Sequence, residues 1–180
     1  MSDEKARAYI GRNTHEHTDQ SDFRTPPYLF DWINDSWGVE YDGACIDGLN
    51  NLATPLRLED EWPIGSVVYS NPPFDSPSIV KWFEKGQDHA AKGGIHIMCL
   101  PNKICQVFFS SMIDRFNEIV FLGGRINFDS PYAVKGGTSM SGTIITRQGG
   151  ECLHHDTPII RGVLIRELKK RWRDKQHEGL

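Results

Sequence analysis

Four consecutive residues, Asn71-Pro72-Pro73-Phe74, combine an amide side chain, two prolines and an aromatic ring. Each proline fixes its own φ, so the Asn71 amide and the Pro72 carbonyl are held in a stiff turn. Two fixed hydrogen-bond acceptors can hold an amino group while it reacts, and stiffness is what such a clamp requires. A proline turn that merely closes a strand is the alternative interpretation, and the residues on either side decide between the two.

The residues before this turn predict its place in the fold. Residues 66–70 form a short apolar run with β-branched members, which predicts a buried strand. Because prolines cannot continue a ladder, the chain leaves the sheet at Asn71, at the carboxyl end of this strand. In open α/β sheets this is the place where ligands bind.

A second predicted strand ends in an acid. Residues 39–42 read as a short strand that ends at Asp42 and is followed by the small residues Gly43 and Ala44. Small residues let the backbone approach a ligand closely, and the carboxylate can then meet a cationic or hydroxyl group. A plain tight turn is the alternative.

Only 29 positions separate Asp42 from Asn71. This is too few for two further strand–helix units, so we expect an abbreviated sheet.

The other elements must position these two strand ends. Thr25 and Pro26 predict a helix start, as cap and first residue, and Gly38 its end; Ser76 and Pro77 predict a second helix that stops at residues 93–94. Strands are predicted at residues 95–100, 118–122 and 143–146, a helix at 104–116, a short extension at 125–128 and a Gly- and Ser-rich loop at 129–142. This alternation predicts an α/β fold with a mostly parallel sheet, covered on both faces and ending in an antiparallel edge hairpin.

The composition is typical of one globular domain: 180 residues, 38% hydrophobic and 24% charged. We expect residues 1–20 to form a mobile arm and residues 21–180 the domain. The apolar runs are short and the first residues are polar, which predicts a cytoplasmic protein. The four cysteines contain no Cys-x-x-Cys motif, so reduced thiols are expected. Two histidine clusters, at residues 15–17 and 154–156, favour loops over a metal site, and no metal is expected.

Residues 161–176 are basic, although the whole chain carries a formal net charge of -4. Leu164, Leu168 and Trp172 have the spacing of one helical face, and cations outnumber acids on the remaining positions. We therefore interpret this stretch as a basic helix. A solvated helix end is one reading; the other is a local surface for phosphate contact, formed by Lys169, Lys170 and Arg173.

Five motifs occur in a single order over roughly residues 23–147: Thr25-Pro26-Pro27, Asp42-Gly43-Ala44-Cys45, Asn71-Pro72-Pro73-Phe74, Leu100-Pro101 and Gly124-Arg125-Ile126-Asn127-Phe128. The third motif alone resembles the signature of enzymes that move a methyl group from S-adenosylmethionine to an amino nitrogen. The whole order resembles the phage-type DNA N6-adenine methyltransferases, a compact Dam-like family. The joint pattern covers most of the chain and is far more specific than any one motif.

The resemblance implies an abbreviated Rossmann-like fold of the S-adenosylmethionine-dependent methyltransferases, located in the cytoplasm of a host cell if the gene is a phage gene. It implies S-adenosylmethionine as cofactor and double-stranded DNA as partner, with no membrane and no metal involved. Carried over position by position, it gives catalytic residues Asn71, Pro72, Pro73 and Phe74. Cofactor contacts are expected from Thr25, Pro26, Asp42, Ala44 and Asn71, and DNA contacts from Phe74, Arg125, Lys169, Lys170 and Arg173.

Two departures from the family pattern are visible. Phe74 stands where tyrosine is frequent, and its ring still offers a face for stacking. No clear strand-borne acid is available for the ribose hydroxyls of the cofactor, and Glu59 and Asp60 are the candidates. Similar loops occur in RNA adenine methyltransferases and in enzymes that methylate glutamine side chains of proteins. A catalytically silent cofactor-binding module is a further alternative, and the oligomeric state stays open.

Overall fold

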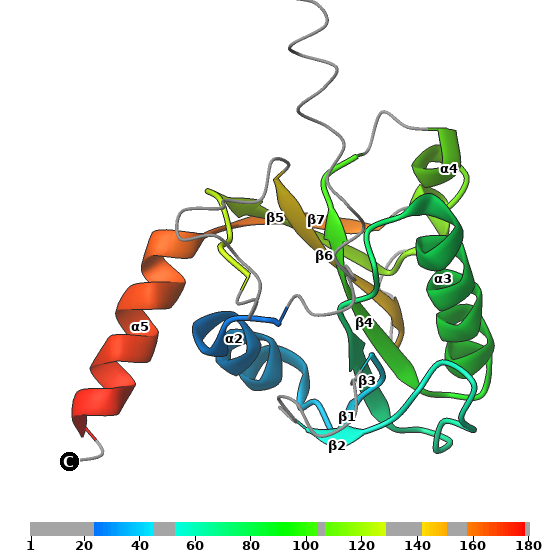
Figure 1. Ribbon diagram of the computed structural model, residues 1–180, viewed down its shortest axis with the longest axis horizontal. Coiled ribbons are helices and arrows are strands. Elements are labelled where there is room, and N and C mark those ends of the chain that lie inside the picture. Colours follow the sequence, from blue (N-terminus) through cyan, green and yellow to red (C-terminus); the bar gives the residue numbers. More distant parts are fainter. Residues whose placement is uncertain (1–23, 45–52, 104–106, 129–141, 151–157, 179–180) are drawn as a thin grey trace, which may run out of the picture.

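Seven strands form one sheet in the computed structural model, which describes residues 24–44, 53–103, 107–128, 142–150 and 158–178 (Figure 1). The strand order across the sheet is β2-β1-β3-β4-β6-β5-β7. The strands are β1 (Tyr41–Asp42), β2 (Thr54–Pro55), β3 (Val67–Ser70), β4 (Ile95–Pro101), β5 (Glu118–Gly123), β6 (Thr143–Gly149) and β7 (Ile159–Leu164).

Neighbouring strands are parallel except at β6, which is antiparallel to both of its neighbours. The predicted α/β fold with a mostly parallel sheet is therefore confirmed, and it is compatible with a Rossmann-like fold. The predicted antiparallel hairpin, β5 with β6, is present, but its predicted place at the sheet edge is wrong. β6 lies between β4 and β5 and pairs with all of β4, because a buried strand needs hydrogen-bond partners on both sides.

Helices cover both faces of the sheet (Figure 1). α2 (Pro27–Trp37) and α5 (Ile165–Glu178) lie on one face, and α3 (Ser76–Ala91) and the short α4 (Val107–Ser110) lie on the other. Successive strand residues point to opposite faces, so Ile97 and Cys99 pack with the apolar residues of α2, whereas Met98 and Leu100 pack with those of α3. The result is three layers with one core on each side of the sheet.

The helix starts differ from expectation in their caps. α2 has Pro26 at its N-cap without a side-chain bond, so the predicted capping role of Thr25 is wrong. α3 is capped by Asp75, whose carboxylate accepts a hydrogen bond from the Ser78 backbone N–H at 2.8 Å, and not by Ser76. The predicted end of α2 is confirmed, because Gly38 adopts the left-handed conformation, φ 65°, that favours glycine.

The carboxyl-terminal part also departs from expectation. Residues 159–164 form β7, so the predicted helix at 161–176 begins only at residue 165, and Leu164 lies in the strand with 45% of its surface exposed. The branched side chains of residues 159, 160 and 163 favour a strand, and pairing with β5 supplies its hydrogen bonds. Ile165 and Leu168 form the buried part of the α5 face instead.

Two further segments are less regular than predicted. The expected helix at residues 104–116 is reduced to α4 and a 3-10 turn, Ile113–Arg115, with residues 104–106 outside the described ranges. The expected extension at residues 125–128 has no regular secondary structure, although Ile126 is fully buried.

Several expectations fall outside the described residues: the arm at 1–20, most of the Gly- and Ser-rich loop, both histidine clusters, and Cys45, Cys105 and Cys152. Within the described ranges, no helix has the length and apolar character needed to cross a membrane.

Candidate active site at the carboxyl edge of the sheet

Asp42 and Asn71 lie at the carboxyl ends of two neighbouring strands. Asp42, the last residue of β1, is the register partner of Tyr69 in β3, and Asn71 directly follows Ser70, the last residue of β3. The chain passes from β1 to β2 on one side and returns to β3 on the other side of β1. This is a point where the strand order reverses, and open α/β sheets bind ligands at the carboxyl ends of the strands there.

The Asp42 carboxyl group is buried, with only 8% of the residue exposed. Its Oδ1 accepts a hydrogen bond from the Ala44 backbone N–H at 3.2 Å. Burial raises the Asp42 pKa from 3.8 to about 6, and the Ala44 N–H partly opposes this rise. Within the described ranges, no Lys or Arg forms an ion pair with this carboxylate. A buried acid in such surroundings is suited to a cationic or hydroxyl-bearing ligand.

Gly43 fixes the turn after Asp42. Its backbone N–H donates to the Tyr69 carbonyl at 2.7 Å. A Cβ at this position would lie 2.9 Å from Val68 Cγ1 and 3.2 Å from the Trp62 ring. The absence of a side chain is thus required by contact with the protein core, whereas the sequence alone had suggested contact with a ligand.

The start of α2 is tied to the end of β3. Thr25 is buried, and its hydroxyl forms a 2.6 Å hydrogen bond with the hydroxyl of Tyr69, a fully buried residue. Pro26 is buried beside it. Three of the predicted cofactor residues, Thr25, Pro26 and Asp42, are therefore gathered around the last residues of β3, and half-buried Ala44 follows in the Asp42 turn.

The Asn71 loop packs against a segment that is distant in the sequence. Pro72 is buried, whereas Asn71, Pro73 and Phe74 are half-buried. The ring of Phe74 meets that of Phe128 edge to face, with centroids 5.7 Å apart. The loop and residues 125–128, two of the motifs noted in the sequence, are thus brought together, and Arg125 is exposed on that segment.

A chain of buried polar groups lies directly behind the loop, and the sequence reading missed it. The Ser70 hydroxyl is 2.6 Å from His96 Nε2, His96 Nδ1 is 2.9 Å from Gln148 Oε1, and Gln148 Nε2 donates to the Phe83 carbonyl at 3.1 Å. His96 lies within the largely apolar strand β4, whereas Gln148 lies in β6, which is rich in polar residues but largely buried. The polar residue inside the apolar run of β4 was the available signal, because buried polar groups need partners.

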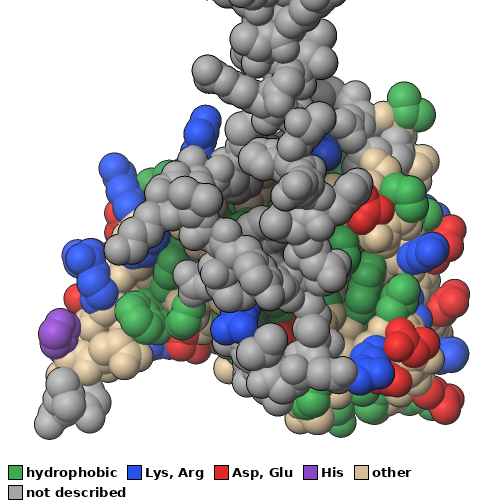
Figure 2. All heavy atoms as spheres, in the orientation of Figure 1, with side chains coloured by type: hydrophobic (Ala, Val, Ile, Leu, Met, Phe, Trp, Pro, Cys, Tyr) green, Lys and Arg blue, Asp and Glu red, His purple; other side chains and the backbone are tan. Residues whose placement is uncertain are grey.

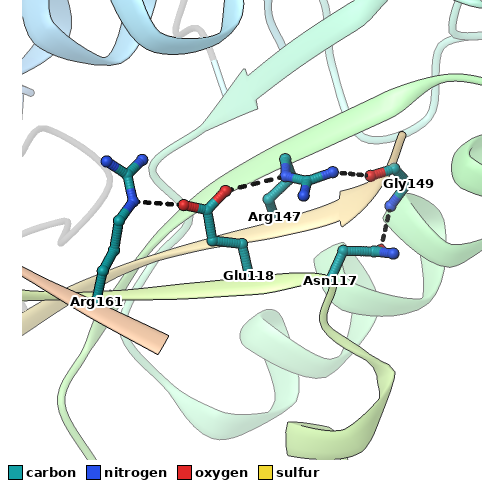
Figure 3. A network of polar contacts seen from close by, with 5 residues as sticks. All are labelled: Asn117, Glu118, Arg147, Gly149 and Arg161. Atoms are coloured by element: carbon teal, nitrogen blue, oxygen red, sulfur yellow. Dashed lines mark hydrogen bonds and ion pairs between the residues drawn. The ribbon is translucent and has the colours of Figure 1, made fainter. Parts of the chain in front are cut away.

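A different polar network lies at the other end of the strands, away from the candidate site (Figure 3). Glu118, at the amino end of β5, is 7% exposed and accepts hydrogen bonds from Arg147 of β6, at 3.1 Å, and from Arg161 of β7. Asn117 accepts from the Gly149 backbone N–H at 2.6 Å. These contacts join three neighbouring strands, and the positive charges of two arginines surround one buried carboxylate.

The candidate DNA residues on α5 have unequal surroundings. Lys169 Nζ lies 5.2 Å above the Tyr28 ring of α2, and Lys175 pairs with Asp31 and Asp35 of α2, so both face the domain. Lys170 and Arg173 are exposed. Figure 2 shows Lys and Arg side chains over α5 at the left of the view.

The two candidate ribose acids lie in the loop between β2 and β3. The Asp60 carboxylate accepts a hydrogen bond from the Arg57 backbone N–H at 2.7 Å, and the Asp60 backbone carbonyl accepts one from Lys85 of α3. Glu59 is exposed. Neither acid follows a strand directly. The described residues contain no group of three or more potential metal ligands. Cys99 is a buried free thiol, and burial raises its pKa to about 12.

No protein-family model matches this chain, and no curated protein matches it either.

Proposed function

We propose that this protein transfers a methyl group from S-adenosylmethionine to the N6 amino group of adenine in DNA. One observation carries the proposal: the Asn71-Pro72-Pro73-Phe74 loop and the buried Asp42 leave adjacent parallel strands at a point where the strand order reverses. The motif order along the sequence, which resembles that of the phage-type adenine methyltransferases, supports the same reaction.

The side chains at this edge fit the proposed cofactor. S-adenosylmethionine carries an ammonium group and ribose hydroxyls, and Asp42 is a buried carboxylate with no cation paired to it among the described residues. Asp42, Thr25, Pro26, Ala44 and Asn71 would hold the cofactor. When bound, it supplies the methyl group, and the bonding electrons stay on sulfur as the sulfur–methyl bond breaks.

The loop would assist a weak nucleophile. The N6 lone pair of adenine is delocalised into the ring, so N6 attacks poorly by itself. The Asn71 side-chain oxygen and the Pro72 carbonyl can each accept one N6–H hydrogen bond, which favours tetrahedral geometry at N6 and stabilises its positive charge as the new bond forms. One N6 proton then leaves and restores a neutral amino group. The two prolines keep both acceptors in place without a cost of reorganisation.

An adenine inside a duplex must leave the stack to reach this edge. Flipping costs about a few kcal/mol, and a ring face on Phe74 would offset part of the lost stacking. Phe74 is half-buried against Phe128, which holds its ring in one orientation. Exposed cations on either side, Arg125 near the loop and Lys170 and Arg173 on α5, would contact phosphates.

The test is to incubate the purified chain with methyl-labelled S-adenosylmethionine and, separately, with duplex DNA, RNA or protein extract. Mass spectrometry of the digested products should find N6-methyladenine in the DNA sample. N4-methylcytosine alone would overturn the assignment of the base, and label only in RNA or in glutamine would support one of the two alternative substrates. Cofactor binding without transfer to any of the three would indicate a silent binding module.

A further inference from the structure

The last two residues of β3 carry polar side chains that are buried on opposite faces of the sheet. Tyr69 points toward α2, where its hydroxyl bonds to Thr25 at 2.6 Å. Ser70 points the other way, and its hydroxyl bonds to His96 at 2.6 Å. Both residues are fully buried. The strand is thus held by a side-chain hydrogen bond on each face immediately before Asn71.

On the face away from α2, the Ser70–His96 hydrogen bond is the first of three that lead on to α3. Gln148 donates from Nε2 to the Phe83 carbonyl of α3, so its Oε1 is left to accept from His96 Nδ1. His96 Nε2 then carries a lone pair and accepts from the Ser70 hydroxyl. The chain therefore has one consistent direction of donation, from Ser70 to His96, from His96 to Gln148, and from Gln148 to the backbone of α3.

The surroundings keep these three hydrogen-bonded side chains in one arrangement and one protonation state. Ser70, His96 and Gln148 are all fully buried. Burial lowers the His96 pKa to about 3, so the imidazole is neutral throughout the ordinary pH range. The Trp62 ring packs edge to face on His96, with centroids 5.0 Å apart, and a Cβ on Gly86 of α3 would lie 2.0 Å from His96 Nδ1. The imidazole has no room to rotate.

A serine bonded to a histidine resembles the nucleophile of hydrolases. Here the serine is fully buried, and its neighbours on that face belong to the core around α3. A substrate therefore has no access to the Ser70 hydroxyl, and the arrangement serves position and not nucleophilic attack.

We propose that Ser70, His96 and Gln148 are positioning residues that hold the Asn71 loop in its reactive geometry by locking the backbone one residue before Asn71. Ser70 and Asn71 share a peptide bond, so any rotation at Ser70 moves the Asn71 acceptor directly. A displacement of about 1 Å at a reacting centre lowers the rate by about a hundredfold. The catalytic consequence rests on the function proposed above, whereas the ordering of the loop does not.

The test compares Ser70→Ala with the matched control Thr146→Val. Both variants remove one buried hydroxyl from the same sheet. Thr146 lies in β6 but takes no part in the Ser70–His96–Gln148 hydrogen bonds, and its hydroxyl has no hydrogen-bond partner within the described part of the protein. We expect Ser70→Ala to lower kcat about ten- to a hundredfold, with the dissociation constant for S-adenosylmethionine changed less than about threefold. Gln148→Leu should act in the same direction with a smaller effect, since it acts through His96. Thr146→Val should leave kcat unchanged.

Amide hydrogen exchange provides a readout that does not depend on methyl transfer. In Ser70→Ala, exchange should become faster at the amides of residues 71 and 74–76, since Pro72 and Pro73 carry no amide hydrogen, and stay unchanged in β4 and β5. Unchanged exchange in residues 71–76 together with unchanged kcat would overturn the proposal. Equal acceleration across the whole sheet would also overturn it, because it would mean general loss of stability. Wild-type protein without any transfer activity would overturn the catalytic half and the proposed function, while the exchange data would still decide whether the loop is held.

Discussion

Two buried carboxylates lie at opposite edges of the same sheet, and their surroundings differ. Glu118, at the amino end of β5, is bonded to two arginines, Arg147 and Arg161. Asp42, at the carboxyl end of β1, is bonded to one backbone N–H and has no cationic partner among the described residues. Burying a charge costs free energy unless it is paired and hydrogen-bonded. The buried acid at the amino end of β5 therefore stabilises the fold, whereas the acid at the carboxyl end of β1 is buried without a cation among the described residues, at a cost in stability.

The difference separates structural from functional roles within one residue type. An acid whose partners join three strands belongs to the fold, and its loss should weaken the fold. An acid that is buried without a cation destabilises the free protein, and the proposed cofactor would offset that cost when bound. The carboxyl edge should respond to substitution mainly through binding and turnover, and the amino edge mainly through unfolding.

The largest expected effect is on the amino edge. Glu118→Gln leaves the buried Arg147 guanidinium, and that of the exposed Arg161, without their counter-charge, and breaking a buried pair costs about 3 to 5 kcal/mol of unfolding free energy. Urea denaturation measures this loss. Arg166→Gln is the matched control, because it removes the exposed Arg166–Glu167 pair, which is worth at most about 1 kcal/mol. Equal losses in the two variants would mean that the Glu118 network contributes nothing special.

The next effect is on turnover. Asn71→Ala should abolish detectable methyl transfer while the fold and cofactor binding stay largely intact, because loss of one transition-state acceptor costs about 2.7 to 4 kcal/mol and the other four proposed cofactor residues remain. Asn102→Ala is the control: Asn102 is an exposed residue that follows β4 at the same edge. Near-normal turnover by Asn71→Ala would remove the loop from the mechanism.

Asp42 should affect stability and binding in opposite directions. The rise of its pKa from 3.8 to about 6 corresponds to about 3 kcal/mol of destabilisation at neutral pH. Asp42→Asn retains an acceptor for the Ala44 N–H, so the ligand-free variant should be more stable than wild type by up to this amount. The increase in Tm that saturating S-adenosylmethionine produces in wild type should become smaller in Asp42→Asn and in Asp42→Ala. A wild-type Tm that does not respond to the cofactor would contradict the donor assignment.

The same group predicts a pH dependence. The Asp42 pKa is raised in the folded state, so the folded protein holds this proton at pH values where the unfolded chain releases it. Its destabilising effect is absent below about pH 4, develops as pH rises from about 4 to about 6, and is complete above that. The stability difference between wild type and Asp42→Asn should therefore be small at pH 4 and full at pH 7. Cofactor affinity should rise over the same interval, because the ionised carboxylate is the binding form.

The smallest effect concerns exposed charge on α5. Lys170→Gln with Arg173→Gln should weaken binding to all DNA sequences alike and lower the slope of log affinity against log salt by about two, one for each lost phosphate contact. Adding Lys169→Gln should lower it by about one more only if the Lys169 ammonium leaves the Tyr28 ring on binding. Lys175→Gln is the matched control, because its ammonium is already paired with Asp31 and Asp35. An unchanged slope in the double variant would point to Arg125 and the loop at residues 129–142 as the DNA surface.

The sequence predicted the features that depend on local chemistry. Prolines at 72 and 73 place the end of β3, Gly38 ends α2, and the apolar run at 95–100 gives β4, because backbone restriction and burial pattern act over a few residues. The placement of Asp42 and of Asn71 at the carboxyl ends of strands was also predicted. These are the parts of the site for which the signal lies within one short stretch.

The features that the sequence reading missed depend on contacts between distant residues. Nothing within residues 143–149 indicates that they insert between β4 and β5, because their pairing on both sides is set by the whole sheet. Leu164 has helical spacing to Leu168, yet pairing with β5 places it in a strand. Ser70, His96 and Gln148 come from three separate strands, so only the assembled sheet brings them together.

The central place of β6 has a consequence during synthesis of the chain on the ribosome. β4 is buried along almost its whole length and obtains its second strand partner only from residues 143–149. When residues 95–101 have emerged, some forty residues that follow must still emerge before that partner can pair with β4. Until then the nascent chain presents an apolar strand with unpaired backbone groups, the kind of edge that templates association between chains. Chains halted before residue 143 should therefore aggregate, and the sheet should be completed only after residues 143–149 have emerged.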